Sequence, residues 1–586
     1  MSPTTKPGPS QLATVTVSPR RLMLLLVGLL LLVFAVGART VYLQSIKNRT
    51  LSQYAQGQQR YTQPLPAVRG DILDRNGQEL AVGEEAVTFY ATPKLLKRRA
   101  ETAVDIAEIL DMSRQDEELL VDRLVNATGG FVYVARQVPR EKAEKLQEAK
   151  IPGVSWNDEE RRMYPAGAVA GQIIGRVDID NKGVDGVEML YDRSLTGRPG
   201  EQVAVVDPTG VPIDVLKLRR ERDGRDVHLT IDATIQQQAE LVLTRTVKKF
   251  GARAASAIVM DPRTGEVLAM ANVPRVNPAK WNRASGLQRR NTAITDMYEP
   301  GSTFKVVAVS AALEEGVVTP DTKKFLKPQM TFCDDKDTCT VKESHPRPAG
   351  WFSTRDILVE SSNIGTITLA QDVAQKYINQ GKCGKCEVDR WIRRFGFGST
   401  TGIDFPGEAP GIMLPTKDWS DVSIGNIPIG QGISVTPIQL AAAYAAIAND
   451  GVIVQPHLLQ RIGSEPRAKY SSRRVLSAKT AATMRSMFEG VVQDDRGTGK
   501  KAGIEGYEVA GKTGTANVAG PDGYSETKYN ASFVGFVPAK NPRLVTLVVV
   551  NEPTNGIFGG DVAAPAFEEI TEFALGYLAI APDGVM

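Results

Sequence analysis

The sequence is poor in the residues on which metal centres and histidine-based catalysis depend. Its 586 residues include only three histidines and four cysteines. The histidines, His228, His345 and His457, are scattered along the chain, and we interpret each as a structural or surface residue. We therefore expect a function that needs no cofactor and no catalytic metal.

The chain also lacks a strong charge of either sign. Its 70 lysines and arginines against 67 aspartates and glutamates leave a net charge of +3, and we find no basic stripe. This balance argues against binding to nucleic acid. The sequence has no internal repeat or low-complexity tract, and its length exceeds what one compact core accommodates, so two or more folded units are expected.

Long apolar runs are absent except for one near the N-terminus. Residues 22–38 are seventeen apolar residues without a charge, and Arg20 and Arg21 precede them. Seventeen residues is the lower limit for a membrane-spanning helix, which could continue past Arg39. A cleaved signal peptide is the alternative, because small residues precede Arg39. We expect an uncleaved anchor whose preceding residues stay in the cytoplasm, since positive charges favour that side.

The four cysteines form two close pairs, Cys333/Cys339 and Cys383/Cys386. Beyond a membrane, in an oxidising compartment, two short-range disulfides are our first expectation. A four-thiolate zinc site, cross-paired disulfides and free thiols remain open.

The remaining patterns predict an α+β architecture. Residues 67–81 read as a strand, a turn at Asn76-Gly77 and a second strand, and residues 95–149 as helices separated by a strand or hairpin. After a charged linker at 219–226, Asp232 is expected to cap a helix that begins at Ala233. Further on we expect a hairpin at 256–261 and 266–272, strands at 529–538 and 544–553, and a helix at 565–579. Short turns between strands predict an antiparallel sheet, with helices packed on it.

A lysine in an apolar helix is the first indication of chemistry. In EPGSTFKVVAVSAALEEG, Pro300-Gly301 break the preceding segment, Ser302 lies at the start of the expected helix, and Gly316 ends it. The helix is apolar on every face, so we expect it to be buried. Burial disfavours the charged ammonium form and should lower the pKa of Lys305. We expect Lys305 to reach the Ser302 hydroxyl from position i+3 and to act as its general base.

Two further motifs follow. Ser361-Ser362-Asn363 comes 59 positions after Ser302, and Lys512-Thr513-Gly514-Thr515 comes 151 positions after Ser361. The second lies on an expected strand, where Gly511 and Gly514 would let another backbone approach closely. A single Ser-x-x-Lys is a weak signal, but the three motifs in this order are the serine-acyltransferase signature of penicillin-binding proteins and β-lactamases.

On these motifs the chain resembles a class B penicillin-binding protein. RGDILDRNG, RRMYPAGAVAGQIIG and GVDGVE resemble the pedestal of that class, and TDMYEPGSTFK, IGQGISVTPIQLAAAYAAIANDG, VAGKTGTA and ASFVGFVP resemble its transpeptidase domain. The short tail, the single anchor and an end soon after the last helix are most like the division-specific FtsI type. The two cysteine-containing inserts depart from the family pattern, and we expect any effect of them at the rim of the site.

The resemblance implies four segments: a cytoplasmic tail at 1–21, a transmembrane anchor at 22–43, a dimerisation-like pedestal at 44–225 and a penicillin-binding transpeptidase domain at 226–586. It places the protein in the bacterial inner membrane, with the catalytic domain in the periplasm. Implied partners are the stem peptides of lipid II-derived glycan strands, a SEDS glycosyltransferase (FtsW-like) and other division proteins. We expect Arg39 to help specify the helix contact with that glycosyltransferase.

The resemblance also implies roles for the motif residues. Ser302 attacks the penultimate D-Ala carbonyl and Lys305 takes its proton, while the N–H groups of Ser302 and Thr515 bind the oxyanion. The remaining implied roles are proton relay by Ser361, donor-peptide binding by Asn363, a field set by Lys512, and substrate binding by Thr513, Gly514 and Thr515.

Three alternatives remain. The chain could be an elongation-type transpeptidase, a hydrolase of the D,D-carboxypeptidase or β-lactamase kind, or a non-catalytic β-lactam sensor. The long pedestal and the lack of an evident carboxylate to activate water argue against the hydrolase, and the intact motifs argue against the sensor.

Overall fold

The computed structural model describes residues 18–47, 60–206, 212–333, 339–466, 469–520 and 523–583. Its contacts divide the chain into two compact units, which are described separately below. One unit comprises residues 1–66 and 199–222, and the other comprises residues 67–198 and 223–586.

The first unit contains the expected apolar helix and a small sheet. Helix α1, Pro19–Val41, continues as a short π-helix, Tyr42–Ile46. Together they are long and apolar enough to cross a membrane. Strands β1 (Arg60–Leu65), β6 (Gly200–Val206) and β7 (Pro212–Arg219) form an antiparallel sheet in the order β1-β6-β7.

The second unit begins with the strand–turn–strand that the sequence predicts. Strands β2 (Ile72–Leu73) and β3 (Glu79–Ala91) pair antiparallel across a turn that contains Gly77. The other elements of this part are α3 (Arg99–Ile109), α4 (Arg114–Val125), β4 (Val132–Pro139), α5 (Arg140–Glu148), β5 (Val154–Met163), α6 (Gly171–Ile174), α7 (Gly186–Leu190) and α8 (Asp192–Leu195).

A buried ion cluster holds the RGD stretch of this region in place. Arg69 donates to Glu188, whose carboxylate also accepts from Arg162, at 2.7 Å in each pair. Glu188 is fully buried, so removing either arginine would leave part of its charge uncompensated.

Strand β8, Val227–Leu229, connects the two parts of the second unit. It pairs in parallel with β2 and antiparallel with β18 (Leu459–Ile462). The Asp232 carboxylate then accepts from the N–H groups of Thr234 and Ile235 and so caps α9 (Ala233–Phe250), as predicted.

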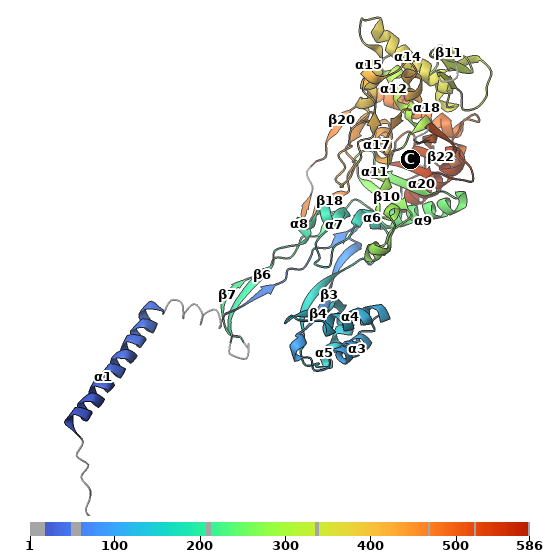
Figure 1. Ribbon diagram of the computed structural model, residues 1–586. Coiled ribbons are helices and arrows are strands. Elements are labelled where there is room, and N and C mark those ends of the chain that lie inside the picture. The colour runs from blue at the N-terminus through green and yellow to red at the C-terminus, as the bar shows by residue number, and fades with distance from the viewer. Residues whose placement is uncertain are drawn as a thin grey trace, which may run out of the picture. The chain divides into compact units, whose positions relative to one another are not determined.

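A five-stranded antiparallel sheet forms the centre of the C-terminal part. Its strands are β9 (Ala254–Met260), β10 (Val267–Val273), β21 (Ala510–Gly520), β22 (Gly523–Val537) and β23 (Leu544–Asn551), in the order β10-β9-β23-β22-β21. Helices α9 and α20 (Ala564–Tyr577) pack beside it (Figure 1). The predicted α+β class is confirmed, and the hairpin at 256–272 is present as β9 and β10.

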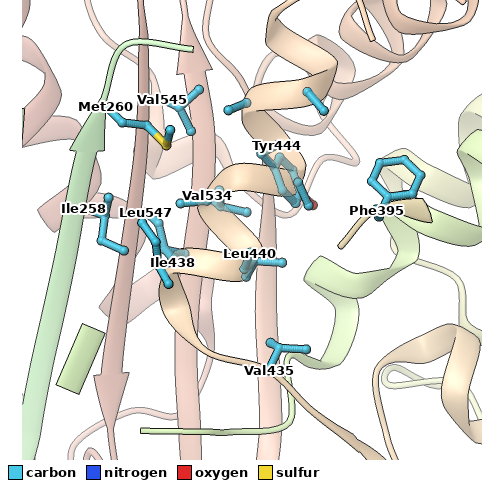
Figure 2. Packing of buried hydrophobic residues seen from close by; sticks show 14 of the residues in the cluster. Ile258, Met260, Phe395, Val435, Ile438, Leu440, Tyr444, Val534, Val545 and Leu547 are labelled. Carbon is cyan, nitrogen blue, oxygen red and sulfur yellow. The ribbon is translucent and has the colours of Figure 1, made fainter. Parts of the chain in front are cut away.

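The opposite face of this sheet carries the helices that support the motifs. Helix α17, Pro437–Ala448, is entirely buried. In Figure 2 its Ile438, Leu440 and Tyr444 lie in one apolar cluster with Ile258 of β9 and Leu547 of β23. The Tyr444 hydroxyl donates to the carbonyl of Thr303 at 2.8 Å, so the core holds the backbone next to Ser302.

The remaining elements surround this core. They include α12 (Lys305–Glu314), β11 (Lys323–Leu326), β12 (Gln329–Thr331), β13 (Thr340–Lys342), β14 (Gly350–Ser353), α13 (Thr354–Val359), α14 (Asn363–Ile378), α15 (Gly384–Arg394), α16 (Ser423–Asn426), β17 (Val452–Val454), β20 (Ser472–Arg474), α18 (Ala478–Gln493) and α19 (Gly559–Val562).

The cysteines are paired as two short-range disulfides, the first of the arrangements left open by the sequence. Cys333 bonds Cys339 just beyond the ends of β12 and β13, and Cys383 bonds Cys386 at the start of α15. A zinc site that uses all four thiolates is excluded by this pairing.

Candidate active site

Ser302 lies in a tight 3-10 turn, Gly301–Phe304, directly before α12. Gly301 has φ +55° and its N–H donates to the carbonyl of Gly430. A Cβ on Gly301 would lie 2.7 Å from the carbonyl oxygen of Thr515. Only glycine tolerates both the dihedral angle and the approach, which brings the serine turn against the Lys-Thr-Gly-Thr strand.

Lys305 is the first residue of α12 and its side chain is fully buried. Its ammonium group donates to the carbonyl of Ser361 at 2.6 Å, to the Ser361 hydroxyl at 3.3 Å and to Oδ1 of Asn363 at 2.7 Å. Two of the three predicted motifs therefore meet at this amine.

The expected hydrogen bond between Lys305 and Ser302 is absent from the described part of the chain. A contact between positions i and i+3 requires one α-helix over both residues, whereas Ser302 lies in the 3-10 turn. The lysine amine is instead occupied by acceptors from the α13–α14 loop. The i, i+3 spacing alone did not determine where a long side chain finds its partners.

Burial lowers the pKa of Lys305 to about 7, as the sequence predicts in direction. The negative charge of Glu343 opposes this shift and the positive charge of Arg347 adds to it. At neutral pH a large fraction of the amine is thus unprotonated and can accept a proton.

The loop after α13 presents Ser361 to the lysine, and the first residue of α14 presents Asn363. Ser361 adopts φ +57°, an unfavourable conformation for a residue with a side chain, and its carbonyl accepts from Lys305. Ser362 caps α14 by accepting from the N–H of Gly365. The Asn363 amide donates to the carbonyl of Lys342, which leaves its oxygen directed at Lys305.

The Lys-Thr-Gly-Thr motif lies on β21, a strand at the edge of the central sheet, as predicted. Lys512 is fully buried, with only long contacts of 3.4 Å to Thr513. Burial, and then repulsion from Lys305, hold the pKa of Lys512 well below its ordinary value. The two amines are therefore close enough for the charge of Lys305 to influence the protonation of Lys512.

Glycine at position 514 permits the close approach that the sequence suggested. A Cβ there would meet the Ser532 hydroxyl at 2.3 Å and the Pro300 carbonyl at 2.9 Å. On either side, Thr513 shares a hydrogen bond with Thr498, and the Thr515 hydroxyl accepts from the N–H of Gly559.

Several residues of the site were not singled out from the sequence. Glu343 accepts hydrogen bonds from the N–H groups of Asn363 and Ile364, and Arg347 pairs with it. The only sequence signal was an acid–base pair at i and i+4, which is common on any surface. Of the three histidines, only His345 lies in this region, with its ring 5.4 Å from that of Phe558.

Comparison with known proteins identifies the two domains. Residues 255–572 match the penicillin binding protein transpeptidase domain, and residues 64–229 match the penicillin-binding protein dimerisation domain. The peptidoglycan D,D-transpeptidase FtsI of Escherichia coli K12 is 33% identical, over 95% of this chain and 91% of that protein. The penicillin-binding protein PbpB of Mycobacterium tuberculosis is 34% identical, over 92% of this chain and 82% of that protein.

Solved structures give the same result. Penicillin binding protein 3 from Mycobacterium tuberculosis, in complex with ampicillin, has a TM-score of 0.69 and 29% identity, over 89% of this chain and 98% of that one. The chain therefore belongs to the class B penicillin-binding proteins, with a dimerisation domain and a transpeptidase domain. Its enzyme class is serine-type peptidoglycan D,D-transpeptidase.

Proposed function

We propose that this protein cross-links peptidoglycan at the bacterial division septum through an acyl-enzyme on Ser302. The observation that carries the proposal is the buried Lys305 amine, which is hydrogen bonded to Ser361 and Asn363 and lies next to the Ser302 turn. A neutral amine there can accept the serine proton and pass it on.

The reaction follows from the residues in order. Ser302 Oγ attacks the carbonyl carbon of the penultimate D-Ala of a stem peptide and loses its proton to Lys305. The N–H groups of Ser302 and Thr515 stabilise the oxyanion, at about 3–4 kcal/mol for each donor. Ser361 relays the proton to the departing D-Ala nitrogen as the peptide bond breaks.

The second half transfers the acyl group. An amine of a neighbouring stem attacks the ester carbonyl and gives up its proton to Lys305. As the ester C–O bond breaks, Lys305 passes that proton to Ser302 Oγ, and the free serine is regenerated. Before that transfer, while the terminal D-Ala is still attached, Thr513 and Thr515 hold its carboxylate, with Gly514 between them, and Lys512 tunes the field.

The hydrogen bonds of Glu343 favour transfer of the acyl group to an amine over its hydrolysis by water. This carboxylate would be the candidate to activate a deacylating water. Its oxygens already accept from Ser362 Oγ and from the backbone of Asn363 and Ile364, and they pair with Arg347. A carboxylate so occupied is a poor general base.

The division role and the membrane placement are supported by the relatives and by the charges beside the apolar helix. The relatives include FtsI of Escherichia coli, and a single N-terminal anchor is most like the division type. Arg20 and Arg21 precede the apolar helix, which favours a cytoplasmic N-terminus and a periplasmic catalytic domain. A SEDS glycosyltransferase of the FtsW kind would contact the anchor.

A direct assay tests the reaction. The full-length protein in detergent is given a peptide that ends in D-Ala-D-Ala together with an excess of a D-amino acid as acceptor. We expect the exchanged peptide to exceed the hydrolysed one and Ser302→Ala to abolish both. Hydrolysis that dominates at saturating acceptor would support the carboxypeptidase alternative. The septal role is tested separately by depletion, in which filamentous growth is expected and rounded cells would indicate elongation.

A further inference from the structure

The short segment that follows β13 contacts the site without belonging to any of its three motifs. The Glu343 side chain is 5% exposed and its carboxylate lies at the N-terminus of α14. One oxygen accepts from the N–H of Asn363 at 2.8 Å. The other accepts from the N–H of Ile364 at 3.2 Å and from the Ser362 hydroxyl at 2.8 Å.

These bonds fix the residues that hold the lysine amine. The neighbouring carbonyl of Lys342 accepts from the Asn363 side-chain amide at 2.9 Å. Backbone and side chain of Asn363 are therefore both anchored by the segment at 342–343. With its N–H₂ group engaged, the Asn363 amide can direct only its oxygen at Lys305.

Arg347 keeps Glu343 in this position. Its guanidinium pairs with the Glu343 carboxylate and donates to Ser362 Oγ. It also lies over the ring of Phe352 at 4.1 Å and 3.9 Å from a carboxylate oxygen of Glu360. Such stacking and pairing leave the guanidinium little freedom to move away.

We propose that Glu343 is a positioning residue for acylation: it fixes Ser361 and Asn363 against Lys305, and Arg347 holds it there. The inference rests on the proposed function, in which Lys305 is the general base. The partners of Glu343 are residues 362–364 and Arg347, so we infer that it acts through the start of α14.

The two residues also act on Lys305 through their charges, with opposite signs. The carboxylate of Glu343 favours the ammonium form of Lys305, and the guanidinium of Arg347 disfavours it. Among the described residues, Lys512 on β21 is a further titratable group close to this amine, and it is common to every variant. Substituting Glu343 or Arg347 should therefore move the titration of Lys305 in opposite directions.

The test measures the rate of acylation of the full-length protein by ampicillin, from pH 5.5 to 9. We expect Glu343→Gln to lower the plateau rate about tenfold, because a side-chain amide would turn a donor toward one of the N–H groups. The acidic side of its pH–rate profile (the acid limb), where the rate rises as Lys305 loses its proton, should move to lower pH. Arg347→Met should move the acid limb to higher pH. Glu343→Asp keeps the charge and should lower the rate with little shift of the limb.

Glu572→Gln is the matched control, since it removes one exposed carboxylate of α20 far along the chain. It should leave rate and profile unchanged. Should Glu343→Gln fail to fold, as judged by thermal melting, Arg347→Met and Glu343→Asp decide the question. The proposal would be overturned if the variants had the plateau rate and acid limb of the wild type. It would also be overturned if the rate fell but the acid limbs of Glu343→Gln and Arg347→Met did not move in opposite directions. A wild-type protein that is not acylated on Ser302 would instead contradict the proposed function.

Discussion

Lys305 has a buried amine whose bonded neighbours are a backbone carbonyl, a hydroxyl and an amide oxygen. The sequence predicted its burial, because the helix around it is apolar on every side. It did not predict those acceptors, which come from a loop 56 to 58 positions away. Local spacing determines from which face of the helix a lysine side chain projects, but the tertiary fold determines which oxygens accept its hydrogen bonds.

The first prediction concerns the pH dependence of acylation. Lys305 has a pKa of about 7, so below this pH the rate should fall about tenfold per pH unit as the base becomes protonated. Above it the rate should level off, because the neutral amine then predominates. Stopped-flow measurement of acylation by ampicillin gives the profile. A rate independent of pH between 5.5 and 8 would be inconsistent with Lys305 as the base.

At the scale of elements, regular patterns were predicted well and irregular ones were not. The Asp232 cap and the hairpin at 256–272 follow from turn residues and alternating apolar positions, which act locally. The hairpin of β12 and β13 has three-residue strands and too little pattern to be recognised. It is ordered by packing, since Val341 joins a cluster with Ile364 and Ile429.

The second prediction tests this hairpin as an element of the site. Replacing Cys333 and Cys339 by serine removes a short covalent loop, worth about 2 kcal/mol by the chain-entropy estimate. Because β13 is followed directly by Glu343, we expect slower acylation as well as a lower melting temperature. Replacing Cys383 and Cys386, at the start of α15, is the matched control and should leave the acylation rate unchanged. If the two double variants were acylated at equal rates, the hairpin would have no part in positioning the site.

At the scale of the whole molecule, the site combines segments that are distant in sequence. Four segments meet at the edge of one sheet: the turn at Ser302, the segment at Glu343, the loop at Ser361 and the edge strand β21. The three motifs could be found in the sequence because their residue types are specific. The supporting residues could not, because Glu343 and Gly430 gain their meaning only from contacts across the fold.

The third prediction concerns the N-terminal apolar helix, where the Arg39 guanidinium lies 5.5 Å from the ring of Tyr42. An arginine within an apolar helix indicates a polar partner, which we propose to be the glycosyltransferase. Arg39→Leu should weaken co-purification with that partner about three- to tenfold, in line with the modest strength of polar contacts between membrane helices. Leu31→Val is a matched control within the same helix. If Arg39→Leu left both complex formation and division unaffected, Arg39 would not have this role.

The most direct test of the account is intact mass spectrometry of the full-length protein with and without ampicillin, beside Ser302→Ala and Lys305→Met. We predict a stable increment of one drug molecule in the wild type, none in Ser302→Ala, and formation slower by at least about a hundredfold in Lys305→Met. A stable increment that persists in Ser302→Ala would contradict the assignment of the nucleophile. Rapid drug turnover without a trapped adduct would contradict the transpeptidase account and identify a hydrolase.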